Sequence, residues 1–370
     1  MAPTVLRIGK LTDTAEEWQA LGSKYTLLEF QSGTREDFLA NCRSGVYDSV
    51  IGCYRSNGST RFTGRFDAEL VDALPKSWKY IAHNGAGYDT IDVDACSRRQ
   101  IAVSNTPIAV DDATADVGIF LMLGALRMAH FSITALRAGK WMGETPRGHD
   151  PKGKTVGILG MGGIGRAFAH RARAFGTRII YHNRRRLDPS LEKDAEYVSF
   201  DDLLARSDIL SLNLALNEST RHIIGAPELA RAKPGVVVVN TARGGLIDEA
   251  ALAEALDSGH VSAVGLDVYE NEPKIHPALV KNERAFLLPH VGTYTYETGR
   301  SKDPLLPKFA SWNIPTLKIS QTTLNSAITD LDIVVELLVL KNLETAVDEG
   351  KMLTLVAEQK GLEWTPPVKL

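Results

Sequence analysis

The sequence predicts an α/β protein of two doubly wound domains, each a parallel sheet with helices on both faces. Two observations support this fold class. Short β-rich runs alternate with amphipathic helical segments, a pattern typical of parallel strands joined by helices. The alternating series occurs twice, and a chain of 370 residues is too long for one small core.

The first series begins near the N-terminus. Its expected strands cover residues 5–10, 25–30, 48–54, 79–83 and 101–104. Amphipathic segments such as TAEEWQALGS and REDFLANCRS separate several of these strands. A long apolar helix is then predicted over 112–138, and the polar connection GHDPKGK follows it.

The second series begins with the apolar run TVGIL. Its expected strands cover residues 155–159, 178–182, 208–214, 236–240, 262–268 and 285–289. Residues 299–330 then contain prolines, many Ser and Thr, and no sustained period. This stretch exceeds the usual loop length of about 12–15 residues. Helical spacing returns at 333–351.

The composition is that of an ordinary globular protein, with 44% hydrophobic and 24% charged residues. A net charge of −3 argues against polyanion binding by the whole chain. The chain has three cysteines, Cys42, Cys53 and Cys96. This number is small and odd, which argues against a disulfide framework. With no signal-peptide pattern and no membrane-spanning run, we expect a cytoplasmic protein in a reducing compartment.

A dinucleotide site is predicted at the start of the second series. Gly160, Gly162 and Gly165 form a G-x-G-x-x-G pattern directly after a strand and directly before a helix. In that setting Gly160 permits the tight turn, Gly162 lets the backbone approach a pyrophosphate, and Gly165 lets helix and strand pack closely. The alternative is a tight turn that binds no ligand.

The next strand ends in the basic run YHNRRR, residues 181–186. An acidic residue at its end would hold the ribose 2′-hydroxyl of NAD, but Asn183 occupies that place. Asn cannot repel a 2′-phosphate, and the guanidinium groups of Arg184 and Arg185 can bind one. We therefore predict a preference for NADP(H), with NAD(H) still possible. A solvated basic loop fits Arg186 better, and nucleic-acid binding is the weakest interpretation.

Three later motifs follow apolar strands and so are expected at one edge of the sheet. They supply Arg243 in NTARGGLID, Glu272 in GLDVYENEP and His290 in LPHVGT. Reduction of a 2-oxo acid places negative charge on the carbonyl oxygen, which a histidinium can protonate. We predict His290 as the acid/base, Glu272 as its partner and Arg243 as the anion clamp. Each alone could be structural.

These motifs resemble those of the D-isomer-specific 2-hydroxyacid dehydrogenase family. The resemblance rests on GMGGIG (160–165), NTARGGLID (240–248), GLDVYENEP (265–273), LPHVGT (288–293), NGAGYDTID (84–92) and NTPIAVDDATADVG (105–118). It covers residues 1–298 and the tail from about 333. Within the family, the chain is most similar to fungal members of the glyoxylate/hydroxypyruvate reductase and mandelate-dehydrogenase-like branches.

The resemblance implies an enzyme acting on CH–OH groups, with a small 2-oxo acid or D-2-hydroxy acid as substrate. It implies a discontinuous flavodoxin-like substrate domain, 1–104 plus about 299–370, and a Rossmann NAD(P)-binding domain, 105–298. It also implies a homodimer, to whose interface the helix at 112–138 contributes. The alternative is a nucleotide-sensing, corepressor-like interaction protein on the same fold.

The family's substrate loop maps onto 84–89, where the backbone N–H groups of Ala86 and Gly87 should hold the substrate carboxylate. An ordinary turn is the alternative there. Candidate pocket residues are Arg55, Tyr54, Tyr88 and Tyr294. By the same resemblance, the cofactor contacts are Gly160, Gly162, Gly163, Ile164, Gly165, Asn183, Arg184, Arg185, Thr220, Thr241, Ala242, Asp267, His290 and Gly292.

The chain departs from the family pattern at three places. Asp116 stands where Glu is common, and Ala215 replaces a common Pro. Residues 299–332 have no counterpart, so we interpret them as an atypical insertion. They represent either translated non-coding sequence from a gene-model error or a lid-like segment.

Overall fold

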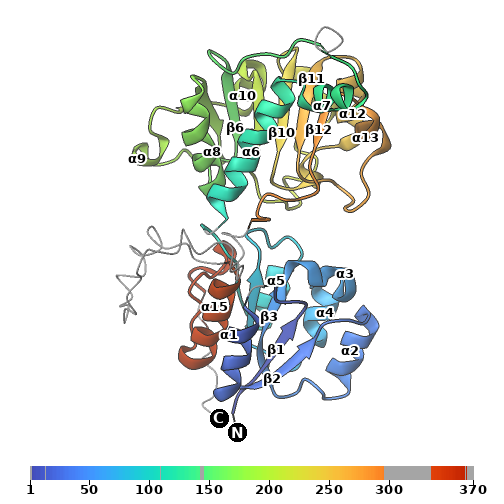
Figure 1. The fold of residues 1–370 in the computed structure, drawn as a ribbon. Helices are drawn as coiled ribbons and strands as arrows, with labels where there is room; N and C mark the ends of the chain where they lie inside the picture. Colours follow the sequence, from blue (N-terminus) through green and yellow to red (C-terminus); the bar gives the residue numbers. More distant parts are fainter. Residues whose placement is uncertain are drawn as a thin grey trace, which may run out of the picture. The chain divides into compact units, whose positions relative to one another are not determined.

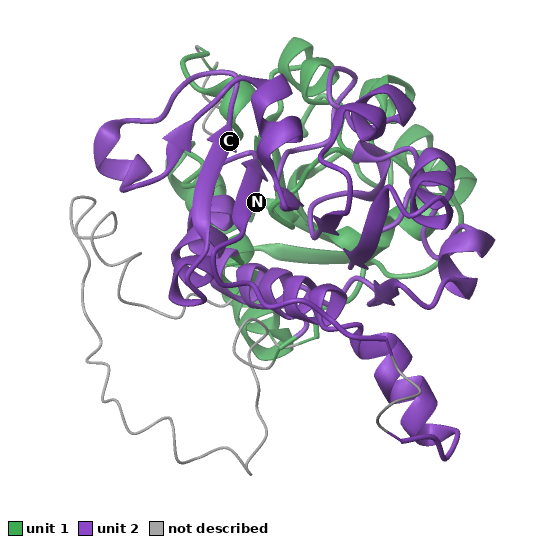
Figure 2. Cartoon of the chain, turned by 90° about the horizontal axis from the view of Figure 1, so that it is seen from above, with its two compact units in different colours: residues 1–110, 295–370 green, residues 111–294 purple. Residues whose placement is uncertain are grey.

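The computed structural model describes residues 2–12, 14–108, 110–141, 146–295, 335–362 and 364. The chain divides into two compact units, shown in Figure 2: unit 1 contains residues 1–110 and 295–370, and unit 2 contains residues 111–294. Each unit is built on one parallel sheet, so the predicted fold class is confirmed. The atypical insertion at 299–332 lies outside the described residues.

Unit 1 contains a five-stranded sheet in the order β2-β1-β3-β4-β5, and neighbouring strands pair in parallel. The strands are β1 (Thr4–Ile8), β2 (Thr26–Phe30), β3 (Val50–Ser56), β4 (Tyr80–Asn84) and β5 (Ala102–Ser104). This is the strand order of a flavodoxin-like sheet.

Both faces of this sheet are buried because successive side chains of a strand point to opposite sides. Leu6 of β1 packs with Phe38 on one face, and Val5 packs with Trp18 and Leu343 on the other. The helices are α1 (Ala15–Ala20), α2 (Arg35–Arg43), α3 (Thr60–Thr63), α4 (Ala68–Ala73), α5 (Val93–Arg98) and α15 (Val335–Glu349).

The C-terminal residues return to unit 1 and complete it. Figure 1 shows the red α15 beside α1 in the blue N-terminal region, and α15 also contacts β3 and β4. The Glu336 carboxylate accepts hydrogen bonds from the amides of Thr12 at 2.9 Å and Thr14 at 3.1 Å. The buried Gln359 accepts a bond from the Val103 amide at 2.8 Å. The two ends of the sequence therefore fold as one unit.

Unit 2 contains a seven-stranded parallel sheet in the order β12-β11-β10-β9-β6-β7-β8. The strands are β6 (Thr155–Leu159), β7 (Arg178–His182), β8 (Glu196–Tyr197), β9 (Ile209–Leu212), β10 (Val236–Asn240), β11 (Val261–Leu266) and β12 (Ala285–Leu287). The order reverses between β6 and β9, as in dinucleotide-binding sheets, which bind ligands outside the carboxyl ends of strands at that point. The two-residue β8 was not predicted, since it is too short to show alternation.

Helices cover both faces of this second sheet. Ile158 of β6 packs with Phe168 on one face, and Leu159 packs with Leu203 on the other. The helices are α6 (Asp111–Leu126), α7 (Ala129–Arg137), α8 (Gly163–Ala174), α9 (Pro189–Glu192), α10 (Phe200–Arg206), α11 (Ala226–Arg231), α12 (Glu249–Asp257) and α13 (Pro277–Lys281).

The prediction of one continuous helix over 112–138 is wrong. Met128 has a left-handed backbone, with φ 52° and ψ 42°, and separates α6 from α7. The two helices bend by 69° at this point. Neither Gly nor Pro stands at 126–128, so the sequence carried no signal for the break. Among the described helices, none alone is long and apolar enough to cross a membrane; α6 and α7 reach that length and composition only as a bent pair.

Candidate active site

The glycine-rich turn connects β6 to α8 at the point where the strand order reverses. Gly160 has φ +98°, and a Cβ there would lie 2.8 Å from the carbonyl of Asn213. A Cβ on Gly165 would lie 2.3 Å from the Gly160 carbonyl oxygen. Gly162 is the N-cap of α8, before Gly163 and Ile164, and its Cβ position has nothing within 4 Å. This open helix N-terminus fits a pyrophosphate, so the residues present fit a dinucleotide.

A carboxylate that sequence reasoning missed lies at the same turn. A Cβ on Gly163 would lie 2.0 Å from the Asp111 Oδ2, so the first residue of α6 packs directly on the first residue of α8. Burial raises the pKa of Asp111 to about 6, against the opposing effect of Arg166. Two acids at a helix start resemble ordinary N-terminal charges, which is why Asp111 drew no prediction.

The side chain of Asn183 contacts the glycine-rich turn. Its Oδ1 accepts a hydrogen bond from the Met161 amide at 2.7 Å, so it holds the glycine-rich turn against β7. Arg184 and Arg185 are exposed, and neither has an ion-pair partner within the described residues. Two guanidinium groups are therefore available beside the turn.

Arg186 is engaged within the protein. Its guanidinium donates to both oxygens of Glu192, at 2.8 and 2.9 Å. The buried Glu192 also accepts from the Tyr181 hydroxyl at 2.5 Å. This arrangement agrees with the interpretation of Arg186 as a loop residue rather than a ligand of the cofactor.

His290 and Glu272 form a hydrogen-bonded pair in unit 2. The distance from His290 Nδ1 to Glu272 Oε2 is 2.9 Å, and the side chains are 38% and 37% exposed. The hydrogen bond to Glu272 raises the pKa of His290, although burial acts against it. Burial alone would raise the pKa of Glu272, but hydrogen bonds from His290 and the Tyr269 amide hold it below its ordinary value. The pair therefore favours imidazolium beside carboxylate.

Arg243 acts on this pair electrostatically. Its charge lowers the pKa values of both His290 and Glu272. Its Nη1 donates to the Ala242 carbonyl at 2.7 Å, while its own carbonyl accepts from the Asn240 amide group at 2.9 Å. The turn after β10 thus holds a cation near the two predicted acid/base residues.

Asp267 holds the backbone on which His290 stands. Its carboxylate is 1% exposed and accepts hydrogen bonds from the amides of Val291 and Gly292, both at 2.8 Å. A Cβ on Gly292 would lie 3.1 Å from Asp267 Oδ2. Burial raises the pKa of Asp267, and the two amides oppose that rise. These bonds fix the backbone that follows His290. The roles of Asp267 and Gly292 as cofactor contacts stay predictions.

The remaining predicted cofactor residues lie in two loops of unit 2: Thr220 in the loop after β9, and Thr241 and Ala242 directly after β10. The Thr220 hydroxyl donates to the Ala215 carbonyl at 2.8 Å and so stabilises the loop after β9. The Ala242 amide donates to Asn240 Oδ1 at 3.0 Å. Thr241 is 9% exposed. Their side chains give no direct evidence of a ligand.

In unit 1, the backbone carbonyl groups of the predicted substrate loop are held by hydrogen bonds. The Gly85 carbonyl accepts from the Thr106 amide at 3.1 Å, and the Ala86 carbonyl accepts from the Asn105 side chain at 2.8 Å. The Gly87 carbonyl lies 3.1 Å from the Nε2 of His83. Within the described residues, the amides of Ala86 and Gly87 have no acceptor. Two neighbouring donors of this kind suit a carboxylate.

Arg55, predicted as a substrate contact, is fully buried in this structure. Tyr54 is also fully buried, and its hydroxyl accepts from the Asn84 side chain at 2.8 Å. The Tyr88 hydroxyl donates to Glu358 at 2.8 Å. Of the four candidate pocket residues, Tyr294 alone is well exposed, at 87%.

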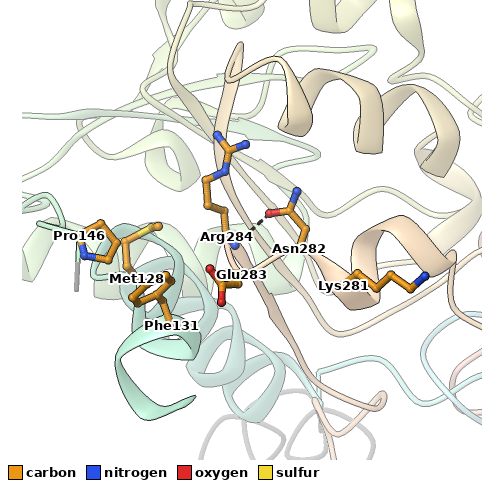
Figure 3. Close-up of a pocket in the computed structure, with 7 residues that line it drawn as sticks. All are labelled: Met128, Phe131, Pro146, Lys281, Asn282, Glu283 and Arg284. Carbon is orange, nitrogen blue, oxygen red and sulfur yellow. Dashed lines mark hydrogen bonds between the residues drawn. The ribbon is translucent and has the colours of Figure 1, made fainter. Parts of the chain in front are cut away.

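A hollow on unit 2 involves none of the predicted site residues. Its lining residues, shown in Figure 3, are Met128, Phe131, Pro146, Lys281, Asn282, Glu283 and Arg284. The Arg284 amide donates to Asn282 Oδ1 at 3.0 Å, which shapes one side. This hollow carries none of the catalytic chemistry described above.

The fold and these contacts define a class of protein: an α/β enzyme with a dinucleotide-binding sheet and a histidine–carboxylate pair. The family described as "D-isomer specific 2-hydroxyacid dehydrogenase, NAD binding domain" matches residues 119–292. The chain is 59% identical over 360 residues to 4-methyl-2-oxopentanoate reductase A of Aspergillus oryzae, covering 97% of this chain and 99% of that protein.

Solved structures give the same result. A glyoxylate reductase from Paecilomyes thermophila is 58% identical with a TM-score of 0.86, covering 97% of this chain and 99% of that one. An NADPH-dependent glyoxylate/hydroxypyruvate reductase from Sinorhizobium meliloti, in complex with NADP and malonate, is 30% identical with a TM-score of 0.74, covering 97% and 98%.

The chain belongs to the D-isomer-specific 2-hydroxyacid dehydrogenase family, as its motifs predicted. It is an NAD(P)-dependent oxidoreductase of the CH–OH group that transfers a hydride between a nicotinamide and a small 2-oxo or 2-hydroxy acid. The corepressor-like alternative is not favoured, because these relatives are named as reductases.

Proposed function

We propose that the protein is an NADP(H)-preferring reductase of small 2-oxo acids, with His290 as its proton donor. The observation that supports this most strongly is the His290–Glu272 pair. The Glu272 carboxylate accepts a hydrogen bond from the ring nitrogen Nδ1 of His290 at 2.9 Å. The other ring nitrogen, Nε2, has no partner within the described residues and is available to a substrate oxygen. A donor of this kind is what reduction of a carbonyl requires.

The proposed reduction proceeds as follows. When bound, the reduced nicotinamide supplies a hydride to the carbonyl carbon of the 2-oxo acid. His290 donates the Nε2 proton to the carbonyl oxygen as negative charge develops there, and Glu272 stabilises the imidazolium until that transfer. Arg243 stabilises the developing alkoxide and the substrate carboxylate. The products are the 2-hydroxy acid and neutral His290, which takes up a proton from solvent.

The loop at 84–88 is the proposed contact for the substrate carboxylate. The amides of Ala86 and Gly87 are the proposed donors, because the carbonyls of residues 85–87 already have partners and these amides do not. A 2-oxo or 2-hydroxy acid always presents this carboxylate, so the contact selects the class rather than the individual substrate.

The nucleotide preference is proposed from the end of β7. Asn183 carries no charge that would repel a 2′-phosphate, and Arg184 and Arg185 are exposed and unpaired within the described residues. We propose these two arginines as the 2′-phosphate ligands. The relative that was solved with NADP is consistent with this preference.

The test compares kcat/KM for NADPH and NADH over a panel of glyoxylate, hydroxypyruvate, phenylglyoxylate and 4-methyl-2-oxopentanoate. The wild type should prefer NADPH, and Asn183→Asp with Arg184→Ala should shift the ratio toward NADH by about 10–100-fold, the effect of removing one or two charge-assisted bonds. Arg186→Ala is the matched control, because Arg186 already pairs with Glu192. It should leave the ratio unchanged.

The same panel decides the substrate class. Turnover of at least one of these acids supports the proposed function, and the pattern across them gives the pocket size. No turnover of any acid with either nucleotide would refute it. An unchanged NADPH/NADH ratio in the double variant would refute the role of Asn183 and Arg184 alone.

We further propose a homodimer that buries the apolar face of α7. Ile133 and Leu136 are 46% and 58% exposed, and Trp141 after the helix is 75% exposed. Ile133 and Leu136 are three residues apart on α7 and so lie on one face of it, and exposed apolar side chains that adjoin in this way are typical of an interaction surface. Light scattering should give a dimer for the wild type and a monomer for Leu136→Asp; a dimer in both would exclude this face.

The cytoplasm is the proposed compartment. All three cysteines are buried and free, which suits a reducing environment. Fluorescence microscopy of the tagged full-length chain tests this, and an organellar pattern would contradict it.

A further inference from the structure

Two buried polar side chains lie side by side on adjacent strands of unit 1. Arg55 on β3 and His83 on β4 are register partners in the parallel sheet, and each is fully buried. The distance from Arg55 Nη1 to His83 Nδ1 is 3.1 Å. Arg55 Nη2 donates to the Thr60 hydroxyl at 2.8 Å, and the guanidinium lies 4.9 Å from the centre of the Phe66 ring.

Burying a guanidinium group in this way costs free energy of folding. Burial lowers the pKa of Arg55 to about 10, with Asp89 acting in the opposite direction, and the guanidinium remains protonated at neutral pH. Its hydrogen-bond partners are uncharged. A buried cation held by neutral partners is poor support for stability alone.

The chemistry of Arg55 decides the tautomer of His83. A guanidinium can only donate hydrogen bonds, so His83 Nδ1 must accept one. The ring proton therefore lies on Nε2, which donates to the Gly87 carbonyl at 3.1 Å. Arg55 thus donates to His83, and His83 donates to the Gly87 carbonyl. We call these two consecutive hydrogen bonds the relay.

The relay ends on the loop that carries the proposed carboxylate donors. Of the three carbonyls at 85–87, those of Gly85 and Ala86 are held by Thr106 and Asn105, and that of Gly87 is held by His83. A Cβ on Gly85 would lie 2.8 Å from His83 Nε2, so glycine is required for this close approach.

We propose that Arg55 and His83 are positioning residues that orient the loop at 84–88 so that its free amides face the substrate carboxylate. This inference rests on the proposed function and deepens it. In this proposal Arg55 is not a direct substrate contact; it acts on the substrate indirectly, through His83 and Gly87. His83 fixes the peptide group of Gly87, and Arg55 fixes the ring of His83.

Two conservative variants of His83 separate this role from simple packing. In His83→Asn, the amide oxygen takes the place of Nδ1 and keeps the partner of Arg55, but the side chain is too short for the Gly87 carbonyl. In His83→Gln, the longer side chain places its amide N–H near the position of Nε2. Steady-state kinetics with glyoxylate and NADPH, together with thermal unfolding, are measured for both.

The KM for glyoxylate should rise about tenfold in His83→Asn, the effect of one lost hydrogen bond, and stay within about threefold of wild type in His83→Gln. The KM for NADPH should be unchanged in both. Arg55→Lys keeps the charge but not the fork of donors, and like His83→Gln it leaves the contact with the Gly87 carbonyl in place, so it should raise the KM for glyoxylate by no more than about threefold. Combined with His83→Asn, it should add little, because both break one relay.

Equal KM values for glyoxylate in the Asn and Gln variants would overturn the inference. So would a parallel rise in the KM for NADPH with a lower unfolding temperature, which indicates a structural role only. If the wild type turns over no 2-oxo acid, the proposed function fails separately. Calorimetric titration with oxalate then tests the loop directly: weaker binding to His83→Asn than to His83→Gln supports the relay, and equal or absent binding overturns it.

Discussion

Two histidines in this protein show how a hydrogen-bond partner decides what an imidazole can do. His290 in unit 2 faces the carboxylate of Glu272 through Nδ1, at 2.9 Å, and its side chain is 38% exposed. His83 in unit 1 faces the guanidinium of Arg55 through the same ring nitrogen, at 3.1 Å, and is fully buried.

The two partners have opposite effects on the protonation of Nδ1. Next to a carboxylate, Nδ1 carries a hydrogen and the doubly protonated ring is favoured, so His290 can give up the Nε2 proton. Next to a guanidinium, Nδ1 must stay unprotonated, so the Nε2 proton of His83 is committed to the Gly87 carbonyl. One histidine is suited to proton transfer, and the other is suited to holding a backbone.

The largest expected effect comes from replacing the proton donor. His290→Gln should lower kcat for reduction by about 10²–10⁴-fold, the usual contribution of general acid catalysis. Steady-state assays with a saturating 2-oxo acid measure this loss. His222→Gln is the matched control, since His222 also pairs with a carboxylate, Glu270, at 2.7 Å. A similar loss in both variants would show that replacing any carboxylate-paired histidine disturbs the enzyme, and would contradict a specific role of His290 in proton transfer.

A smaller effect is expected from neutralising the partner. In Glu272→Gln the pKa of His290 should fall, because burial and Arg243 both act to lower it once the carboxylate is gone. The decline of kcat/KM for reduction with rising pH should therefore begin at a lower pH than in the wild type. Above that pH, kcat/KM should be roughly tenfold lower for every pH unit by which the profile has moved. Profiles from pH 5 to 9 test this, with Glu270→Gln as control. Superimposable profiles would rule out Glu272 as the group that sets this pKa.

The raised pKa of His290 also makes the free energy of unfolding depend on pH. The folded pKa of His290 lies above its unfolded value, so the pair contributes fully to the unfolding free energy below the unfolded pKa. This contribution is lost as the pH rises through the folded pKa. Chemical denaturation of the wild type and Glu272→Gln should therefore differ more at pH 6 than at pH 9.

The smallest effect is expected at Asp111, a carboxylate whose pKa burial raises to about 6. The folded state binds this proton more tightly, so stability is highest below the unfolded pKa and falls as the pH rises toward 6. The loss should be on the order of 1 kcal/mol after allowance for solvent screening. Denaturant titrations of the wild type and Asp111→Asn at pH 4.5 and 7.5 measure it. A pH dependence that persists in the variant would assign the effect to another group.

Much of this site follows from local sequence because its parts are local. The strand–GMGGIG–helix pattern predicted the turn between β6 and α8, since glycine is required where chains approach closely. Glu272 and His290 drew attention because each follows an apolar strand, and parallel strands end at one edge. The missing acid at Asn183 was visible, but its bond to the Met161 amide was not, because that contact joins the loops that follow two different strands, β6 and β7.

What the sequence by itself determined is the α/β class, the family and the residue types at the strand ends, since these depend on periodicity and short motifs. The tertiary structure alone decided the break at Met128, the pairing of Asp267 with the amides of Val291 and Gly292, and the burial of Arg55 beside His83. Each of these depends on which neighbour a group meets in space. Partner and burial set the protonation of a side chain, and residue type and spacing do not encode them.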